Sequence, residues 1–202
     1  MQTIIMEVYN NIAASFDKTR RAKWKGVTEF INSLQSKSMI LDMGCGNGKY
    51  LDSRKDCYFI ALDACANLVD IAQYNHPTTT DFAIGNGLNL PFTNDKFDAV
   101  ISIAVLHHLT TKELRSRFIQ EALRVLVPGG KLYVTVWAVD CQMKNKDKWI
   151  KLSTDNDYLV PWKTNGHTFH RFYHLYSEDE VKDISSTYKY EDGNYHIEIT
   201  RV

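Results

Sequence analysis

The sequence predicts an α/β fold built on a mostly parallel sheet whose last strand is antiparallel. Three observations indicate this class. An apolar run ends at Asp42 and is followed by glycines at alternate positions, 44, 46 and 48. Further along the chain, apolar strand-like runs alternate with amphipathic helical stretches. The chain then closes with a hairpin pattern around Asp192-Gly193, a favoured turn pair.

Helices are placed by apolar spacing and by capping residues. The spacing predicts helices over residues 4–16 and 22–35, a short helix after the glycine loop, and a helix over 65–75. Capping boxes of the T-x-x-E and S-x-x-E type predict two more helices, which begin at Thr110-Glu113 and at Ser177-Glu180.

Strands are placed by short apolar runs. The expected strands are 38–42, 57–63, 80–85, 96–104 and 131–139, followed by the final hairpin. Between Asp140 and His167 the periodicity fades, and we expect a long polar loop there.

Composition is that of an ordinary globular chain. The 202 residues are 44% hydrophobic and 24% charged, which is enough for one sizeable core and a single domain over residues 1–202. Lys+Arg and Asp+Glu balance at 24 each, so no overall positive field favours nucleic acid. Binding to RNA would therefore need local basic residues or a basic partner.

The cysteines and the hydropathy pattern indicate the cellular compartment in which the chain is expected. The four cysteines (Cys45, Cys57, Cys65, Cys141) show no C-x-x-C pair and no metal-ligand spacing, so we expect no metal site and a reducing compartment. The N-terminus lacks the pattern of a signal peptide, and about 18 consecutive apolar residues occur nowhere. We expect a cytoplasmic chain, with nuclear access possible, and no membrane partner.

The glycine loop indicates the type of ligand. A dinucleotide site needs G-x-G-x-x-G, whereas the third glycine here comes one residue early. Asp42 would repel a pyrophosphate but would attract the ammonium group of S-adenosylmethionine (AdoMet). The motif D-x-G-C-G-x-G resembles the first motif of the Rossmann-like AdoMet-dependent methyltransferases. Read alone, the loop is equally compatible with a tight strand-to-helix turn.

Later strands carry further candidate cofactor residues. Asp63 ends the second strand about 20 residues after the loop, where an acidic residue binds ribose hydroxyls; the alternative is a helix N-cap. Asn86 stands where the superfamily usually has an acidic residue facing the adenine amino group. The side-chain carbonyl of Asn86 can accept a hydrogen bond from that amino group, but without charge assistance. The expected AdoMet-binding residues are Asp42, Gly44, Gly46, Asn47, Asp63, Asn86 and Ile103.

Several longer motifs resemble one family. They are VYNNIAASFDKTR with Trp24, LDMGCGNGKYL, SIAVLHHL, GGKLYVTVWA, DYLVPW and FHRFYHLY, and they cover nearly the whole chain. Together they resemble the tRNA methyltransferases that esterify 5-carboxymethyluridine at the anticodon wobble position. The resemblance implies a class I methyltransferase fold with a seven-stranded sheet. Two departures are Asn86 and a loop between Trp137 and Pro161 that is shorter than in many relatives.

The reaction implied by the resemblance is methyl transfer from a sulfonium to a carboxylate oxygen. A carboxylate is ionised at neutral pH, so the site must orient it rather than deprotonate it. Arg20 and Arg171 are the candidates, because guanidinium binds carboxylate or phosphate in a bidentate way. His107 follows the fourth strand and is expected to hydrogen-bond substrate or AdoMet, with a capping or core role as the alternative.

RNA-binding candidates lie in the second half of the chain. Trp137 and Trp162 are placed to stack on an extruded anticodon base, or simply to pack. His170 and His174 are expected near the uridine or a phosphate, or to orient a neighbour. The basic cluster expected to contact phosphate, or to form a solvated loop, is Lys144, Lys146, Lys148 and Lys151.

The third strand suggests a protein partner. In the superfamily's strand order it lies at a sheet edge, and the segment Asp81–Gly85 contains no Lys or Pro to protect it. An unprotected edge permits strand addition by a partner. The resembled family works with a small zinc-binding activator subunit, so the resemblance implies a heterodimer that acts on the tRNA anticodon loop.

Two other functions remain open from the sequence. The neutral charge favours a methyltransferase for a small-molecule acid or another metabolite. A noncatalytic, methyltransferase-like scaffold subunit is the third possibility, and the intact glycine loop and Asp63 argue against it.

Overall fold

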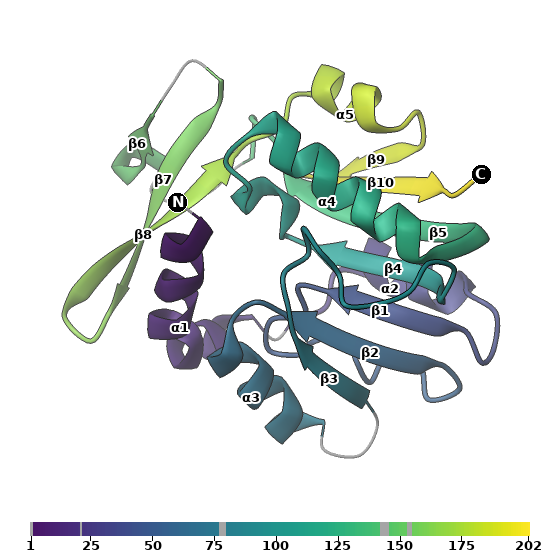
Figure 1. Cartoon of the computed structure of the whole chain (residues 1–202). Coiled ribbons are helices and arrows are strands. Elements are labelled where there is room, and N and C mark those ends of the chain that lie inside the picture. The colour runs from purple at the N-terminus through teal and green to yellow at the C-terminus, as the bar shows by residue number, and fades with distance from the viewer. Residues whose placement is uncertain (1, 21, 77–79, 142–145, 153–154) are drawn as a thin grey trace.

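A seven-stranded sheet forms the centre of the computed structural model, which describes residues 2–20, 22–76, 80–141, 146–152 and 155–202 (Figure 1). The strand order is β3-β2-β1-β4-β5-β10-β9. The strands are β1 (Met39–Met43), β2 (Tyr58–Asp63), β3 (Thr80–Ile84), β4 (Phe97–Ile103), β5 (Leu126–Trp137), β9 (Tyr188–Glu191) and β10 (Asn194–Thr200).

Strand directions confirm the predicted sheet. β1 pairs in parallel with β2 and β4, β2 with β3, and β4 with β5. The last strand, β10, is antiparallel to both β5 and β9, and it lies between them. The C-terminal hairpin therefore inserts its second strand beside β5 and leaves β9 at the edge.

Helices cover both faces of the sheet. They are α1 (Gln2–Thr19), α2 (Lys25–Ser33), α3 (Ala66–Asn75), α4 (Lys112–Val125) and α5 (Glu178–Ile184), with short 3-10 turns η1 (Leu106–His108) and η2 (Lys146–Lys148). Alternate residues along the central strands bury opposite faces. Leu41 packs in a core with Phe118 of α4 and Val181 of α5, whereas Ile40 packs with Ile31 of α2 and Ala72 of α3.

A second sheet was not expected from the sequence. β6 (Ile150–Lys151), β7 (Asp157–Thr164) and β8 (His167–His174) form an antiparallel three-stranded sheet beside α1 (Figure 1). The prediction of a structureless loop up to His167 was therefore wrong for residues 157–164. Pro161 weakens the strand signal, but it sits inside β7 opposite His170.

Three local expectations also change. The residues after the glycine loop form turns over 44–53 instead of a short helix. The cap of α4 is Thr111 rather than Thr110, and its hydroxyl accepts from Leu114 N at 3.3 Å. The Ser177-Glu180 capping box is confirmed, with both reciprocal bonds present. Within the described residues, the helices are too short or too polar to cross a membrane.

The glycine turn after β1 requires glycine for steric reasons. Gly44, Gly46 and Gly48 all have positive φ, at 90°, 54° and 81°. A Cβ at Gly44 would lie 2.4 Å from Cγ2 of Val105, which follows β4. The backbone amides of Gly44 and Cys45 both donate to Leu62 O, at 2.7 and 3.0 Å. The turn is thus held against the end of β2 with its backbone exposed to a ligand.

We predict that Gly44→Ala destabilises the chain more than Gly129→Ala does. Gly129 also has a positive φ, 78°, but a Cβ there would meet nothing within 4 Å. Gly129→Ala should cost only the backbone strain, about 1–2 kcal/mol. Gly44→Ala should cost a further ~1–3 kcal/mol for overpacking against Val105. Urea unfolding measures both variants, and equal losses would contradict the steric account.

Candidate active site

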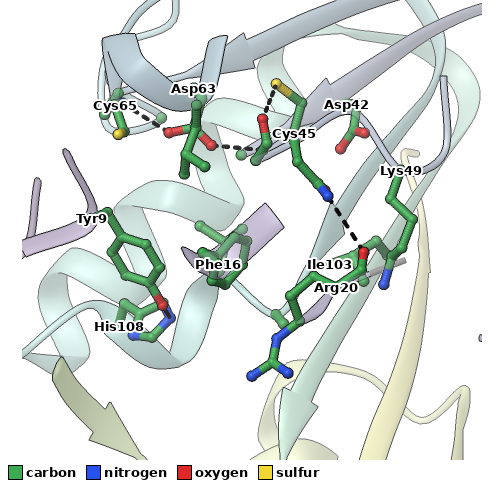
Figure 2. A pocket seen from close by; sticks show the side chains of 18 of the residues that line it. Tyr9, Phe16, Arg20, Asp42, Cys45, Lys49, Asp63, Cys65, Ile103 and His108 are labelled. Carbon is green, nitrogen blue, oxygen red and sulfur yellow. Dashed lines mark hydrogen bonds between the residues drawn. The ribbon is translucent and has the colours of Figure 1, made fainter. Parts of the chain in front are cut away.

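A cavity of about 450 Å³ opens at the carboxyl ends of β1, β2 and β4, which is the edge where open α/β sheets bind ligands. Residues of α1, including Tyr9 and Phe16, form the wall opposite the sheet. Tyr9 and Phe16 pack against a small apolar cluster that contains Leu68 of α3. Figure 2 shows these side chains and the polar groups that face them.

Asp42 supplies a buried negative group at the end of β1. Its side chain lines the cavity, and the residue is 2% exposed. Burial and the nearby Asp63 carboxylate raise its pKa to about 7, and the Lys49 ammonium partly offsets them. A carboxyl group in this state gains most from a ligand cation, because a cation restores its charged form.

Asp63 links the glycine turn to the second strand. Its carboxylate accepts from Gly46 N at 2.9 Å and from Cys65 N at 2.8 Å (Figure 2). The N-cap of α3 is Cys65, so the alternative reading of Asp63 as the cap is wrong. Burial raises the pKa of Asp63, while the backbone amides oppose that shift. Oδ2 accepts from Gly46 N and Oδ1 from Cys65 N, and a carboxylate has about four lone-pair sites, so it can still accept a hydroxyl.

The other expected cofactor residues also reach the cavity. Gly44, Gly46, Asn47, Asn86 and Ile103 line it together with Asp42 and Asp63. Asn86 Oδ1 accepts from Leu88 N at 2.9 Å, so one of its two lone pairs is already used. Asn47 Nδ2 donates to Asp17 Oδ1 at 2.9 Å and ties the turn to α1.

This donor set fits AdoMet. A buried carboxylate beside a bare glycine turn suits the methionine ammonium, and a second, preorganised carboxylate at the end of the next strand suits ribose hydroxyls. In the described residues, no three His, Cys, Asp or Glu side chains gather in a way that could hold a metal ion.

Two cations face the same cavity. Arg20 follows α1, and its guanidinium lies 5.6 Å from the Phe16 ring centre and 5.7 Å from that of Trp162. Lys49 was missed from the sequence, although it directly follows the glycine loop. Its Nζ lies 5.1 Å from the Trp24 ring centre, and burial and the charge of Arg20 lower its pKa to about 8.

The structure brings His108, rather than His107, to the cavity. His107 is fully buried behind it, and burial holds the pKa of His107 well below its usual value. His108 Nδ1 donates to Phe172 O at 2.8 Å, and burial lowers the His108 pKa to about 3. Its Nε2 therefore carries no proton and accepts from the Tyr9 hydroxyl at 2.8 Å. The expected contact of His107 with a ligand is not supported, because Trp137 and Tyr173 pack against its ring.

Arg171 lies behind the cavity wall rather than in it. It is 3% exposed and donates from Nη1 to the Tyr173 hydroxyl at 2.9 Å. The guanidinium lies 4.7 Å from the Trp162 ring centre. Tyr9 and Tyr173 line the cavity and are the neighbours that favour its charge. Arg171 thus reaches a ligand only through these two tyrosines, and their role is not predicted from the sequence.

The aromatic RNA candidates occupy different places. Trp137 lines the cavity and stacks on Tyr173 with ring centres 4.3 Å apart. Trp162 packs beside Arg20 and Arg171, and its Nε1 donates to Ser15 Oγ at 2.9 Å. Trp162 therefore also holds β7 against α1.

His170, His174 and the Lys candidates among the described residues lie outside the cavity. His174 is 2% exposed, and its ring nitrogens lie 2.7 Å from Asp157 Oδ1 and 2.9 Å from Glu180 Oε1. This arrangement joins β7, β8 and α5, so the expected RNA contact of His174 is not supported. His170 is exposed on β8. Among the lysine candidates, Lys146 donates to Val139 O at 2.7 Å. Lys148 and Lys151 are exposed, and Lys144 lies outside the described residues.

Comparison with known proteins gives a consistent family. Residues 41–134 match the family model "Methyltransferase domain". The chain is 34% identical to the tRNA (carboxymethyluridine(34)-5-O)-methyltransferase of Schizosaccharomyces pombe, over 91% of this chain and 86% of that protein. It is also 34% identical to a Xenopus tropicalis protein of the same name, over 88% of this chain. The chain covers 36% of the length of that Xenopus relative.

Solved structures show the same fold. A SAM-dependent methyltransferase from Methanosarcina mazei superposes with a TM-score of 0.72 over 86% of this chain and 97% of that one, at 22% identity. A methyltransferase solved in complex with the Haloferax volcanii Trm112 methyltransferase activator superposes with a TM-score of 0.58, at 22% identity, over 65% of this chain and 60% of that one.

We predict that affinity for S-adenosylhomocysteine, the demethylated form of AdoMet, rises with pH between about 5.5 and 7. Asp42 has a raised pKa of about 7, so the ligand-free carboxyl binds a proton at pH 6 that an ammonium must displace. The dissociation constant should fall as pH rises, by at most ~10-fold per pH unit. Asp42→Asn should lose most of this slope. Calorimetry across this range tests it, and a flat profile in the unmodified chain would contradict it.

Proposed function

Because this chain belongs to the tRNA (carboxymethyluridine(34)-5-O)-methyltransferase family, we propose that it methylates 5-carboxymethyluridine at the tRNA wobble position with AdoMet. The product is the ester 5-methoxycarbonylmethyluridine. AdoMet, when bound, supplies an electrophilic methyl group on its sulfonium. The residues of the chain bind and orient the two reactants and exclude water from the space between them.

The state of His108 is the observation that carries this proposal. It is the one histidine among the described residues that line the cavity, and both its ring nitrogens are engaged, by Phe172 O and by the Tyr9 hydroxyl. Its low pKa makes it a poor base. Asp42, whose pKa is about 7, is assigned to the AdoMet ammonium and not to the acceptor. An acceptor that is already ionised therefore suits this site, whereas an alcohol or ammonium acceptor would need a base.

Arg20 is placed to hold that acceptor. Its guanidinium faces the cavity among aromatic rings, on the side where Trp162 packs. A bidentate guanidinium can fix one edge of a carboxylate and point a lone pair at the methyl group. Tyr9 and Tyr173, supported by Arg171, complete this wall. Trp137 in the cavity supplies an aromatic face for a uracil ring.

RNA contacts outside the cavity would come from β7 and β8. His170 is exposed on β8, where it pairs with Pro161 of β7, and Lys163 is exposed on β7. Lys146 and Lys148 lie in η2 of the same region. We assign these side chains to the phosphates of the anticodon stem-loop, and because the net charge is zero, a basic surface on a partner would strengthen this binding.

The product ester gives a direct test of the reaction. The chain, with its activator, is incubated with AdoMet labelled in the methyl group and with tRNA that carries 5-carboxymethyluridine. We expect label in the wobble nucleoside, released as methanol by mild alkali because esters are alkali-labile. Matched tRNA with unmodified uridine should stay unlabelled. Alkali-stable label, or label only in a metabolite acid fraction, would contradict the proposal and favour the small-molecule alternative.

We predict that Arg20→Gln lowers kcat/KM for this tRNA by about 10–100-fold, the value of a charged hydrogen bond. Affinity for S-adenosylhomocysteine should change less than about twofold, because Asp42 and Asp63 are untouched. Arg117→Gln, at an exposed arginine of α4, is the matched control and should leave both values unchanged. A loss confined to KM, with a shallower salt dependence, would instead assign Arg20 to a phosphate.

We also propose that the β3 edge binds a small, zinc-binding activator subunit. β3 lies at the sheet edge as expected, and Ile84 at its end is 62% exposed. The Haloferax neighbour, which shares the fold, is a complex with the Trm112 methyltransferase activator. Strand addition at Asp81–Gly85 would pair the free backbone groups of β3 and cover Ile84.

We predict that Ile84→Glu weakens activator binding at least tenfold, because it places a charge in an apolar contact. Ile150→Glu, at a similarly exposed isoleucine (50%) on β6, should bind as the unmodified chain does. Size-exclusion chromatography of mixtures with the activator measures this. Equal binding by both variants would contradict the β3 edge as the binding site. Full activity of the isolated, monomeric chain on tRNA would contradict the need for an activator.

The cysteines bear on the compartment in which the chain works. All four cysteines are buried, and Cys45, Cys57 and Cys65 are free thiols, which supports a reducing compartment. We propose a cytoplasmic location, and fractionation of cells that express a tagged chain tests it: recovery in an oxidising compartment would contradict it.

A further inference from the structure

Lys49 is a cavity residue with no role in the function described so far. It directly follows the glycine turn, and its Nζ lies 5.1 Å from the Trp24 ring centre and 4.9 Å from that of Tyr50. The Tyr50 hydroxyl accepts from Trp24 N at 3.1 Å, so the two rings form a connected frame around the ammonium. Lys49, Trp24 and Tyr50 all line the cavity.

Lys49 and Asp42 form a pair of opposite charges at this end of the cavity. Figure 2 shows them on the same side, across from Tyr9 and His108. Each affects the ionisation of the other: Lys49 lowers the pKa of Asp42, and Asp42 raises that of Lys49. A carboxylate and an ammonium side by side are complementary to the two charged groups of an α-amino acid.

We propose that Lys49 binds the α-carboxylate of the methionine end of AdoMet, while Asp42 binds its ammonium group. This inference rests on the AdoMet dependence in the proposed function, but not on the identity of the methyl acceptor. It adds a specificity-determining residue, because Lys49 would distinguish AdoMet from adenosyl ligands that lack the carboxylate.

The position of Lys49 favours this assignment over contact with the acceptor. Lys49 shares its end of the cavity with Asp42 and the glycine turn, whereas Arg20 packs on Phe16 and Trp162. Arg20 and Lys49 repel one another, since the charge of Arg20 lowers the Lys49 pKa. Two separate carboxylates, one from each reactant, would neutralise the two cations.

The experiment compares two ligands: S-adenosylhomocysteine and its decarboxylated analogue, which keeps the amine and the adenosine. Calorimetry at pH 7 gives dissociation constants for the unmodified chain, Lys49→Met, Arg20→Gln and the control Lys112→Met. Lys112 is an exposed lysine of α4 with an 84% exposed side chain. Methionine keeps the apolar stem of Lys49 between its rings while removing the charge.

We expect the unmodified chain to prefer S-adenosylhomocysteine by about tenfold or more, the value of a charge-assisted hydrogen bond. Lys49→Met should lose this preference by weakening only the carboxylate-bearing ligand. Arg20→Gln and Lys112→Met should keep it.

Other outcomes overturn the inference. Equal weakening of both ligands in Lys49→Met would mean that Lys49 only supports the fold. A preference that survives in Lys49→Met, or that disappears in Arg20→Gln, would place the carboxylate on another group. These results leave the proposed function standing, whereas a lack of binding of either ligand to the unmodified chain would reject both.

Discussion

The buried carboxylate of Asp63 is the interaction on which the candidate site depends. It receives backbone amides from Gly46 in the turn after β1 and from Cys65 at the start of α3, and so holds two loops in one arrangement. Without it, the positive-φ turn would lose the hydrogen bond from Gly46 N that ties it to the end of β2. The same carboxylate keeps lone pairs for a ligand. One group thus shapes the site and takes part in binding, and its burial is what makes both roles strong.

The rest of the cavity is built by segments outside the seven-stranded sheet. α1 contacts α3 through Asn10, whose Oδ1 accepts from Asn67 N, and it contacts β7 through the bond from Trp162 to Ser15. The bond from Tyr9 to His108 joins α1 to η1. These contacts enclose a cavity with two carboxylates and Lys49 near the glycine turn, and with a second cation, Arg20, at the end of α1. That polarity is what allows a cationic methyl donor and an anionic acceptor to bind in one orientation.

The parts predicted from the sequence are those with local physical signatures. The glycine turn, Asp63 and the final hairpin were predicted because positive φ, strand ends and turn pairs leave short-range patterns. β7 was missed because Pro161 and its polar neighbours weaken a strand signal that depends on pairing with β8. His107 was predicted to face the ligand, but His108 lines the cavity instead. Which of the two adjacent histidines does so depends on the orientation of η1, and the sequence does not indicate that orientation. Tyr9 and Arg171 meet only after α1 and β8 pack together, so their pairing has no local pattern.

The central claim is that the cavity binds AdoMet in one direction, with its amino-acid end at Asp42 and its ribose at Asp63. A crystal structure with S-adenosylhomocysteine tests this most directly. The account predicts ribose hydroxyls within hydrogen-bond distance of Asp63, the ammonium at Asp42, and the sulfur facing the space beside Arg20 and Tyr9. A ligand bound in the reverse direction, or ribose hydroxyls held by groups other than Asp63, would contradict it.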